Sequence, residues 1–495
     1  MLKAATGRVA NLLNEGTPTH RLPPEILAKI LYLAVDHGSE EYAGQVIPLT
    51  HVCTYWRTLL LSYPRIWSTL CLKPGNPRVI SEWLTRSQNA PLTVIAEFTD
   101  AYEHPLCRYE DLTTATLADT YDLEVCPRHE AILSLDQLLL HRSRIRDLTI
   151  LVHLSDPDWQ EDDSSGEPGL LYHHFFKRGL PNLQRLDFRA AHVERTRYVI
   201  PIPDSLFAGN LPRLEELKYL GVSGGLTKTA TKLVSCEFGF WSKSAGPTII
   251  APGVLQTLFY NNKTVKSLTI TECEFFAISD AWIPTAIPMK NLKYLEIHCS
   301  MDDVLQKIVN CIHAPQFRSL DTVQLSLFRR SVRVVATDGS GHTFKFSQPI
   351  GGDPSFDPLR HLGANITTLR LDRGMTHPHL DDAPSLYKLV RSFDAVRVLE
   401  FDGAVVSVDN VITNLLSVVG VLPWLEVIRA AVSPGDCRGA LQLLGVALML
   451  RRDEGKPLTA IEPLMAEDED GLGRELRMEW EKHYEVEEIQ KLLSE

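Results

Sequence analysis

Residues 22–31 read LPPEILAKIL, residues 52–57 read VCTYWR and residues 64–67 read PRIW. Pro23 and Pro24 stand where the first turn of a helix tolerates a missing N–H, and the Glu25 carboxylate suits the positive end of the helix dipole. Apolar residues then recur at spacings of three and four as far as Ala34, which predicts an amphipathic helix. The same spacing predicts a second helix over residues 49–60, after Pro48.

These helices carry more apolar surface than so short a segment can bury. A unit of roughly fifty residues buries only about 60% of the surface that its unfolded chain exposes. This segment nevertheless contains Trp56, Trp67 and many leucine and isoleucine residues. Either the helices pack into the core of the remaining chain, or they offer an apolar face to a partner.

Taken together, the three stretches resemble an F-box, whose pattern here is L-P-x-E-I-L-x-x-I-L, then V-C-x-x-W-R, then P-x-x-W. One departure is the link from His37 to Ile47, which is longer and more acidic than in the shortest family members. The resemblance implies the substrate-receptor subunit of an SCF-type cullin–RING ubiquitin ligase, in which the F-box binds the small Skp-family adaptor.

The resemblance also implies roles for individual residues. The first contact ridge for the adaptor would be formed by Leu22, Pro23, Ile26, Leu27 and Ile30. The helical core and the remaining contact surface would be formed by Val52, Cys53, Trp56 and Trp67.

Composition and charge fit a soluble globular protein. Of 495 residues, 44% are apolar and 23% charged, and the net charge is −12. Residues 462–495 hold 12 acidic and 4 basic side chains, a net charge of −8, which leaves −4 for the rest of the chain. An acidic tail on a nearly neutral body argues against nucleic-acid and anionic-membrane partners, and we expect neither.

The cysteines and apolar stretches indicate a compartment. Nine cysteines without a C-x-x-C pair fit neither a disulfide framework nor a zinc ribbon, and they favour a reducing environment. We see no secretory signal, and the most apolar stretch, residues 440–450, is too short to cross a bilayer. We therefore expect a cytoplasmic and/or nuclear protein.

Beyond residue 128 the chain repeats one phrase: an apolar residue, two others, a second apolar residue, one other and a third apolar residue. Its copies are Ile145-Leu148-Ile150, Leu183-Leu186-Phe188, Leu214-Leu217-Tyr219, Val265-Leu268-Ile270, Leu292-Leu295-Ile297, Leu320-Val323-Leu325, Ile366-Leu369-Leu371, Val396-Leu399-Phe401 and Leu425-Ile428-Ala430, with Leu233-Cys236-Phe238 as a degenerate copy. Most steps between copies are near thirty residues. Helix-like segments lie between them.

The last two apolar positions of the phrase are two residues apart, so they lie on one face of a strand. A single strand-plus-helix unit cannot bury that face, whereas units stacked in order bury a continuous core. The pattern resembles leucine-rich repeats in an irregular form that lacks the regular asparagine. The alternative is a doubly wound α/β domain, which also alternates strands and helices.

The predicted fold class is therefore α/β: a short all-α F-box-like unit, then an irregular leucine-rich-repeat-like solenoid with a curved parallel sheet and outer helices. Alternating residues around the Gly-rich turn 338–341 predict a β-hairpin within the repeats. The predicted organisation is a flexible segment 1–19, the F-box-like domain 20–72, a connecting segment 73–127, the repeat domain 128–451 with the hairpin at about 331–348, and an acidic segment 452–495 with a helix.

Candidate chemistry is weak throughout. Residues 221–229 lack the glycine spacing of a phosphate-binding loop. Residues 377–382 contain histidines and aspartates, but their pattern suits helix capping better than a metal site. Four residues have the types of a zinc site: His298, Cys299, Cys311 and His313. The flanking apolar pattern instead predicts that Cys299 and Cys311 belong to the repeat core. We expect no enzymatic activity, no cofactor and no metal.

The pattern as a whole favours a non-catalytic receptor that captures a protein substrate, not identified by sequence, through the repeat domain. Candidate substrate anchors are Trp159, Trp241 and Trp282, because tryptophan is enriched at binding hot spots. Two alternatives stay open. The chain could be a repeat scaffold without a ligase role, in which the first helices only cap the solenoid, or an enzyme.

Overall fold

A computed structural model gives the fold. It describes residues 16–39, 41–72, 77–99, 127–154, 178–192, 200–202, 207, 211–224, 232–239, 248–249, 260–271, 273–274, 287–298, 312–313, 320, 322–328, 331–349, 365–372, 393, 395–402, 422–430 and 460–463. The chain divides into two compact units. Unit 1 comprises Met1–Asn262 and Cys273–Phe276, and unit 2 comprises Lys263–Glu272 and Ala277–Glu495.

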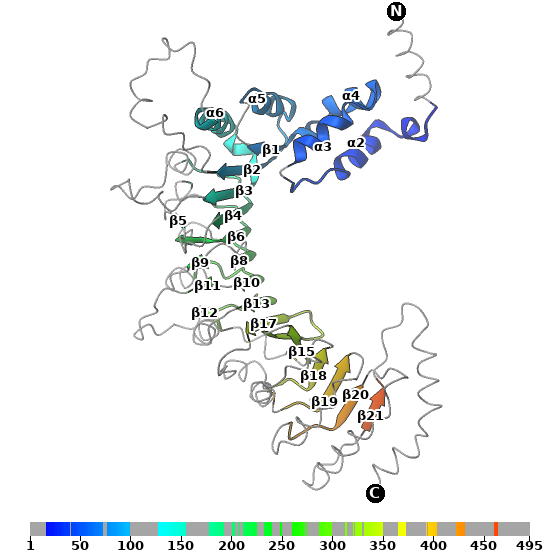
Figure 1. The fold of residues 1–495 in the computed structure, drawn as a ribbon, viewed down its shortest axis with the longest axis vertical. Coiled ribbons are helices and arrows are strands. Elements are labelled where there is room, and N and C mark those ends of the chain that lie inside the picture. The colour runs from blue at the N-terminus through cyan, green and yellow to red at the C-terminus, as the bar shows by residue number, and fades with distance from the viewer. Residues whose placement is uncertain are drawn as a thin grey trace, which may run out of the picture. The chain divides into compact units, whose positions relative to one another are not determined.

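The described elements of unit 1 are helical at first and then mostly strands (Figure 1). The helices are η1 (Pro18–Arg21), α2 (Pro24–Leu33), α3 (Tyr42–Leu49), α4 (Thr54–Leu61), η2 (Pro64–Trp67), α5 (Pro77–Arg86), α6 (Pro127–Leu140) and η5 (Arg142–Arg144). The strands are β1 (Thr69–Leu72), β2 (Leu92–Thr99), β3 (Ile145–Leu154), β4 (Arg185–His192), β5 (Ile200–Ile202), β6 (Glu216–Leu220), β7 (Val222–Gly224), β8 (Ser235–Gly239), β9 (Thr248–Ile249) and β11 (Cys273–Glu274).

The described elements of unit 2 are strands. They are β10 (Ser267–Thr271), β12 (Ile287–Pro288), β13 (Tyr294–His298), β14 (Ile312–His313), β15 (Thr322–Phe328), β16 (Ser331–Thr337), β17 (Thr343–Pro349), β18 (Thr368–Asp372), β19 (Val398–Asp402), β20 (Val427–Ala430) and β21 (Ala460–Pro463).

The first predicted helix is confirmed as α2, and the second prediction is wrong in its start. The Pro23 carbonyl accepts hydrogen bonds from the backbone N–H groups of Ile26 and Leu27, both at 3.0 Å. The helix predicted over residues 49–60 begins later than expected, because α3 ends at Leu49 and α4 runs from Thr54 to Leu61. Cys53 between them has an extended backbone, and its Sγ caps α4 by accepting from the Trp56 N–H at 3.4 Å.

The main sheet of unit 1 is parallel and follows the chain, in the order β1-β2-β3-β4-β6-β8. Its register aligns the repeated phrases. The second positions form one row, Leu148-Leu186-Leu217-Cys236, and the third positions form another, Ile150-Phe188-Tyr219-Phe238. All eight side chains are buried. Contacts along these rows bury the apolar face that no single repeat could cover.

A tight turn precedes the strand in five repeats. The N–H of its fourth residue donates to the carbonyl of its first at 3.2–3.3 Å, in Leu180–Leu183, Leu211–Leu214, Met289–Leu292, Phe393–Val396 and Leu422–Leu425. The first and fourth side chains are buried in every copy. Proline follows the first residue in three copies, because its fixed φ suits the second position of such a turn.

Side chains at the third position of this turn also join neighbouring repeats. Asn182 Nδ2 donates to the Ser143 carbonyl at 2.5 Å in unit 1, and Asn291 Nδ2 donates to the Lys263 carbonyl at 2.8 Å in unit 2. Each asparagine directly precedes the first apolar residue of its phrase, and each acceptor lies two residues before that of the preceding copy. The same contact between an asparagine side chain and a backbone carbonyl of the preceding repeat therefore occurs in both units.

The predicted hairpin is confirmed, and it is built into the sheet of unit 2. The antiparallel strands β16 and β17 flank the turn at residues 338–341. The strand order is β10-β13-β17-β16-β15-β18-β19-β20-β21, with β17 parallel to β13 and β15 parallel to β18. The hairpin therefore supplies two strands between successive repeats.

These arrangements confirm the α/β class and a large, mostly parallel sheet. The sheet of unit 1 begins at Thr69, inside the range predicted for the F-box-like domain, and the last described strand of unit 2 ends at Pro463, beyond residue 451. Within each unit the described repeat strands follow the chain without the reversal of order that marks a doubly wound sheet. The curvature of a solenoid stays a prediction.

Gly221 gives a test of how closely the strands approach. Its φ is +74°, and an added Cβ would collide with the Ala190 carbonyl oxygen. We expect Gly221→Ala to lower the free energy of unfolding by at least about 2 kcal/mol, because it adds a collision to the strain of a positive φ. Gly341 has φ +85° with open space around it, so Gly341→Ala should cost only about 1 kcal/mol. Equal losses in urea unfolding would contradict the close approach.

Candidate functional site

Helix α2 is apolar on two of its faces. Leu27 and Leu31 are buried and pack inside the N-terminal group of helices from η1 to η2, which we call the helical unit. Ile26, Ile30 and Leu33, spaced four and three residues apart, remain 48%, 46% and 68% exposed. Residues at this spacing lie on one side of a helix, so the three form a stripe, which we call the α2 stripe.

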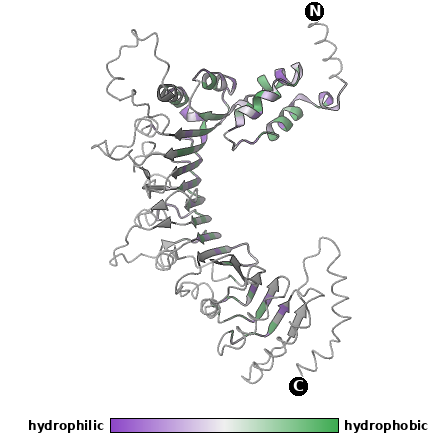
Figure 2. Cartoon of the chain, in the orientation of Figure 1, coloured by the Kyte–Doolittle hydropathy of each residue, from purple (hydrophilic) through white to green (hydrophobic). Residues whose placement is uncertain are grey.

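Exposed apolar side chains continue in α3, in the turn that follows it and in α4. Ile47, Val52 and Leu61 are also exposed. With the α2 stripe, this segment holds six of the eleven large apolar residues exposed in the described part of the chain. Figure 2 shows hydrophobic residues among hydrophilic ones on α2, α3 and α4. Exposed apolar residues scattered singly are ordinary, whereas such a concentration is typical of an interaction surface.

The structure divides the residues predicted to bind the adaptor between surface and core. Pro23, Ile26, Ile30 and Val52 are exposed. Three more are half-buried: Leu22, Cys53 and Trp56. Leu27 and Trp67 are fully buried, so they can support a binding surface but do not form it.

Cys53 and His20 link η1 to α4. The Cys53 Sγ lies 3.6 Å from the His20 Nε2, and the His20 ring lies 4.8 Å from the Tyr55 ring, centroid to centroid. The thiol also caps α4. These contacts fix the entry to α2 against the start of α4.

Three aromatic side chains join the helical unit to the sheet of unit 1. The Trp67 and Trp83 rings lie 5.0 Å apart edge to face, and Tyr42 lies 6.0 Å from Trp83. The Tyr42 hydroxyl donates to the Ile66 carbonyl at 2.9 Å, and Trp67 Nε1 donates to the Leu60 carbonyl at 2.8 Å. Burial raises the pKa of the Tyr42 phenol, which keeps it protonated as a donor. We call Tyr42, Trp67 and Trp83 the aromatic joint.

Little in the sequence pattern indicates the aromatic joint. Tyr42 lies in the link that departs from the F-box pattern, and Trp83 lies in the predicted connecting segment. β1 begins at Thr69, two residues after Trp67, so the joint connects the helices to the first strand of the sheet.

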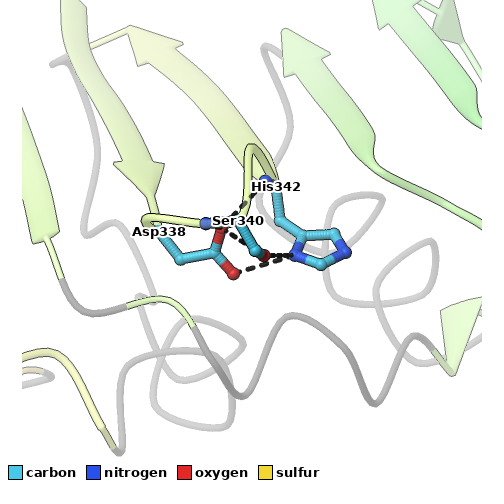
Figure 3. Close-up of polar contacts among 3 residues, drawn as sticks. All are labelled: Asp338, Ser340 and His342. Atoms are coloured by element: carbon cyan, nitrogen blue, oxygen red, sulfur yellow. Dashed lines mark hydrogen bonds and ion pairs between the residues drawn. The ribbon is translucent and has the colours of Figure 1, made fainter.

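The turn between β16 and β17 brings together the residue types of a hydrolase triad without its geometry. Ser340 Oγ and Asp338 Oδ2 both contact the same ring nitrogen of His342, Nδ1, at 2.6 and 2.8 Å (Figure 3). A triad needs the serine on one ring nitrogen and the carboxylate on the other. Asp338 Oδ1 also accepts from the backbone N–H groups of Ser340 and His342 at 2.9 Å, so the cluster holds the turn.

Other chemical candidates gain no support from the described residues. Groups of histidine, cysteine and acidic residues able to hold a metal do not occur among them. His298 Nε2 bonds to Glu296 Oε1 at 2.9 Å, and Gly221 makes a close strand contact. Further predicted candidates lie outside the described residues: Cys299, Cys311, residues 377–382, Trp159, Trp241 and Trp282. None of the described helices has the length and apolar content needed to cross a bilayer.

The aromatic joint gives a prediction about stability. We expect Trp67→Ala to lower the free energy of unfolding by about 3–5 kcal/mol, because it empties a large buried site between η2 and α5. Leu140 on α6 is an exposed control, and Leu140→Ala should change stability by less than about 0.5 kcal/mol. Similar small effects of both substitutions in chemical denaturation would show that the joint is not a packed core.

A scan of the sequence against models of known protein families gives no match, and a search of curated proteins finds no significantly similar sequence. The F-box resemblance therefore stays a prediction.

Proposed function

We propose that this protein is the substrate-recognition subunit of an SCF-type cullin–RING ubiquitin ligase. In this proposal the N-terminal helices are an F-box that binds a Skp-family adaptor, and the strand array is an irregular leucine-rich-repeat-like solenoid that binds a protein substrate. The chain itself performs no chemistry and works in the cytoplasm and/or nucleus.

The α2 stripe is the observation that carries the proposal. A helix whose buried face is already packed leaves its second apolar face without a role in the fold. Burial of apolar surface yields about 25 cal/mol per Å², so exposed isoleucine and leucine side chains favour association with a partner. The F-box resemblance places the adaptor at Ile26 and Ile30, two of the three residues of this stripe.

The repeats support the second half of the proposal. Apart from the inserted hairpin of β16 and β17, the described strands of the main sheet follow chain order within each unit, and the same turn precedes five of them. Stacked repeats of this kind offer an extended surface and need no active-site cavity. Such a surface is suited to holding another protein.

The aromatic joint favours a second candidate, a repeat scaffold in which the helices cap the first strand. Tyr42, Trp67 and Trp83 bind the helical unit to β1 and α5, as a cap would. Capping accounts for the buried sides of these helices. It leaves the α2 stripe unexplained, so we favour the receptor.

Adaptor binding tests the proposal directly. We expect the triple change Ile26→Ser, Ile30→Ser and Leu33→Ser to weaken binding of a purified Skp-family adaptor by about 100-fold or more, since hot-spot residues each contribute about 1–2 kcal/mol or more. Thermal unfolding of the chain should hardly change, because all three side chains are exposed.

Helix α6 provides the matched control. Leu133 and Leu140 are exposed and seven residues apart on one side of that helix. Leu133→Ser with Leu140→Ser should leave adaptor affinity unchanged in calorimetry. Equal adaptor binding by the native chain and the triple variant would contradict the receptor and favour the scaffold.

A further inference from the structure

Two neighbouring repeats of unit 2 carry lysine at the same two positions. Lys263 and Lys290 each lie two residues before the first apolar residue of their phrase. Lys266 and Lys293 each directly follow that apolar residue. All four lysines are exposed. We call them the lysine quartet.

Backbone contacts hold the lysine quartet together. The Lys266 carbonyl accepts from the N–H groups of Lys293 and Tyr294 at 2.8 and 2.9 Å, and Asn291 Nδ2 donates to the Lys263 carbonyl at 2.8 Å. The quartet stands at the start of β10 and β13, which are adjacent and parallel. Adjacent strands lie about 4.8 Å apart, and three residues span at most about 11 Å, so the four Cα atoms lie within roughly 12 Å of one another.

The positive charge of the quartet remains when nearby acidic residues are counted. The segments that contain β10, β13 and the start of the adjacent β17 hold five lysines and two acidic residues, Glu296 and Asp338, in residues 263–271, 289–298 and 338–345. With histidines neutral, their net charge is +3. Glu296 is bonded to Tyr294 and His298, and Asp338 to His342. The side chains of these two acidic residues are only 16% and 4% exposed.

Stacking of the repeats does not require lysine at these positions. The equivalent residues of two repeats in unit 1 are Pro181 and Gln184, and Pro212 and Glu215. Like charges close together repel one another, so the quartet costs the fold some stability. The chain as a whole has a net charge of −12, which makes a compact group of exposed cations distinctive. Such a group is suited to an anionic partner.

We propose that the lysine quartet binds a short acidic segment of the protein substrate. The proposal rests on the proposed receptor function and names a class of substrate for it. Four extended residues span about 13 Å, which matches the extent of the quartet. Each exposed ion pair is weak, so binding needs several carboxylates at once and is sensitive to salt. The negative charge of the whole chain opposes a long polyanion, which favours a protein segment over nucleic acid.

Binding of a model peptide to the full-length chain tests the proposal. The probe is fluorescein-labelled octaglutamate, followed by anisotropy at low salt. We expect saturable binding by the native chain, and binding at least about tenfold weaker by the variant Lys263→Gln, Lys266→Gln, Lys290→Gln, Lys293→Gln, because its ion pairs are lost. Labelled octaglutamine should not bind. Thermal unfolding of the variant should hardly change, since all four residues are exposed.

Removal of the same charge elsewhere provides the control. The variant Lys29→Gln, Arg65→Gln, Arg142→Gln, Arg213→Gln changes four exposed residues from different parts of unit 1, and it should bind octaglutamate within about twofold of the native chain. Equal losses in the two variants, or no binding by the native chain, would overturn the proposal. Tighter binding of octathymidylate than of octaglutamate would also overturn it. The assay contains no adaptor, so its failure would leave the adaptor proposal standing.

A second measurement uses the native chain alone and needs no variant to fold. Carbodiimide coupling joins carboxylates of bound octaglutamate to nearby lysine amines, and mass spectrometry locates the links. We expect them mainly at the lysine quartet, with few at Lys29, which is equally exposed to the reagent on α2. Equal link yields at Lys29 and the quartet, or no link at the quartet, would contradict the proposal.

Discussion

Stacking of strands in register is the constraint on which the rest of the structure depends. One strand of this chain presents two apolar side chains on one face, and a single unit cannot remove them from water. Rows such as Leu148-Leu186-Leu217-Cys236 solve this by placing equivalent residues side by side. The recurring turns and the asparagines at positions 182 and 291 then fix the spacing between neighbouring repeats. Because the strand positions are set by neighbours, the polar face can vary without loss of the fold.

The helical unit buries its apolar side chains on one side and leaves apolar side chains exposed on the other. Its inner side chains, with Tyr42 and Trp67 among them, are buried against β1 and α5. Its outer side keeps Ile26, Ile30 and Leu33 in water. A fold that needed these helices only as a cap would gain nothing from apolar residues there. In the proposed receptor, the α2 stripe is one half of an interface, and the aromatic joint anchors the helices to the first strand of the sheet.

Sequence patterns predicted the strands better than the site. Each copy of the phrase, including the degenerate Leu233-Cys236-Phe238, has its last two positions in a strand, because period-two burial is a local property. The start predicted for the second helix, at residue 49, was wrong because apolar spacing continues across the break at Cys53, where only the backbone and the thiol cap reveal the boundary. The division of α2 into a buried and an exposed face depends on contacts with residues distant in sequence, as does the aromatic joint. Neither can be read from periodicity alone.

Hydrogen–deuterium exchange of the full-length chain, with and without a Skp-family adaptor, tests the central claim most directly. If the α2 stripe is the binding surface, adaptor addition should slow exchange within Pro24–Leu33 and leave β18–β20 unchanged, because the adaptor would cover the helix and restrict its opening. Unchanged exchange in α2 at saturating adaptor, or slowed exchange only in the sheet strands, would contradict the account.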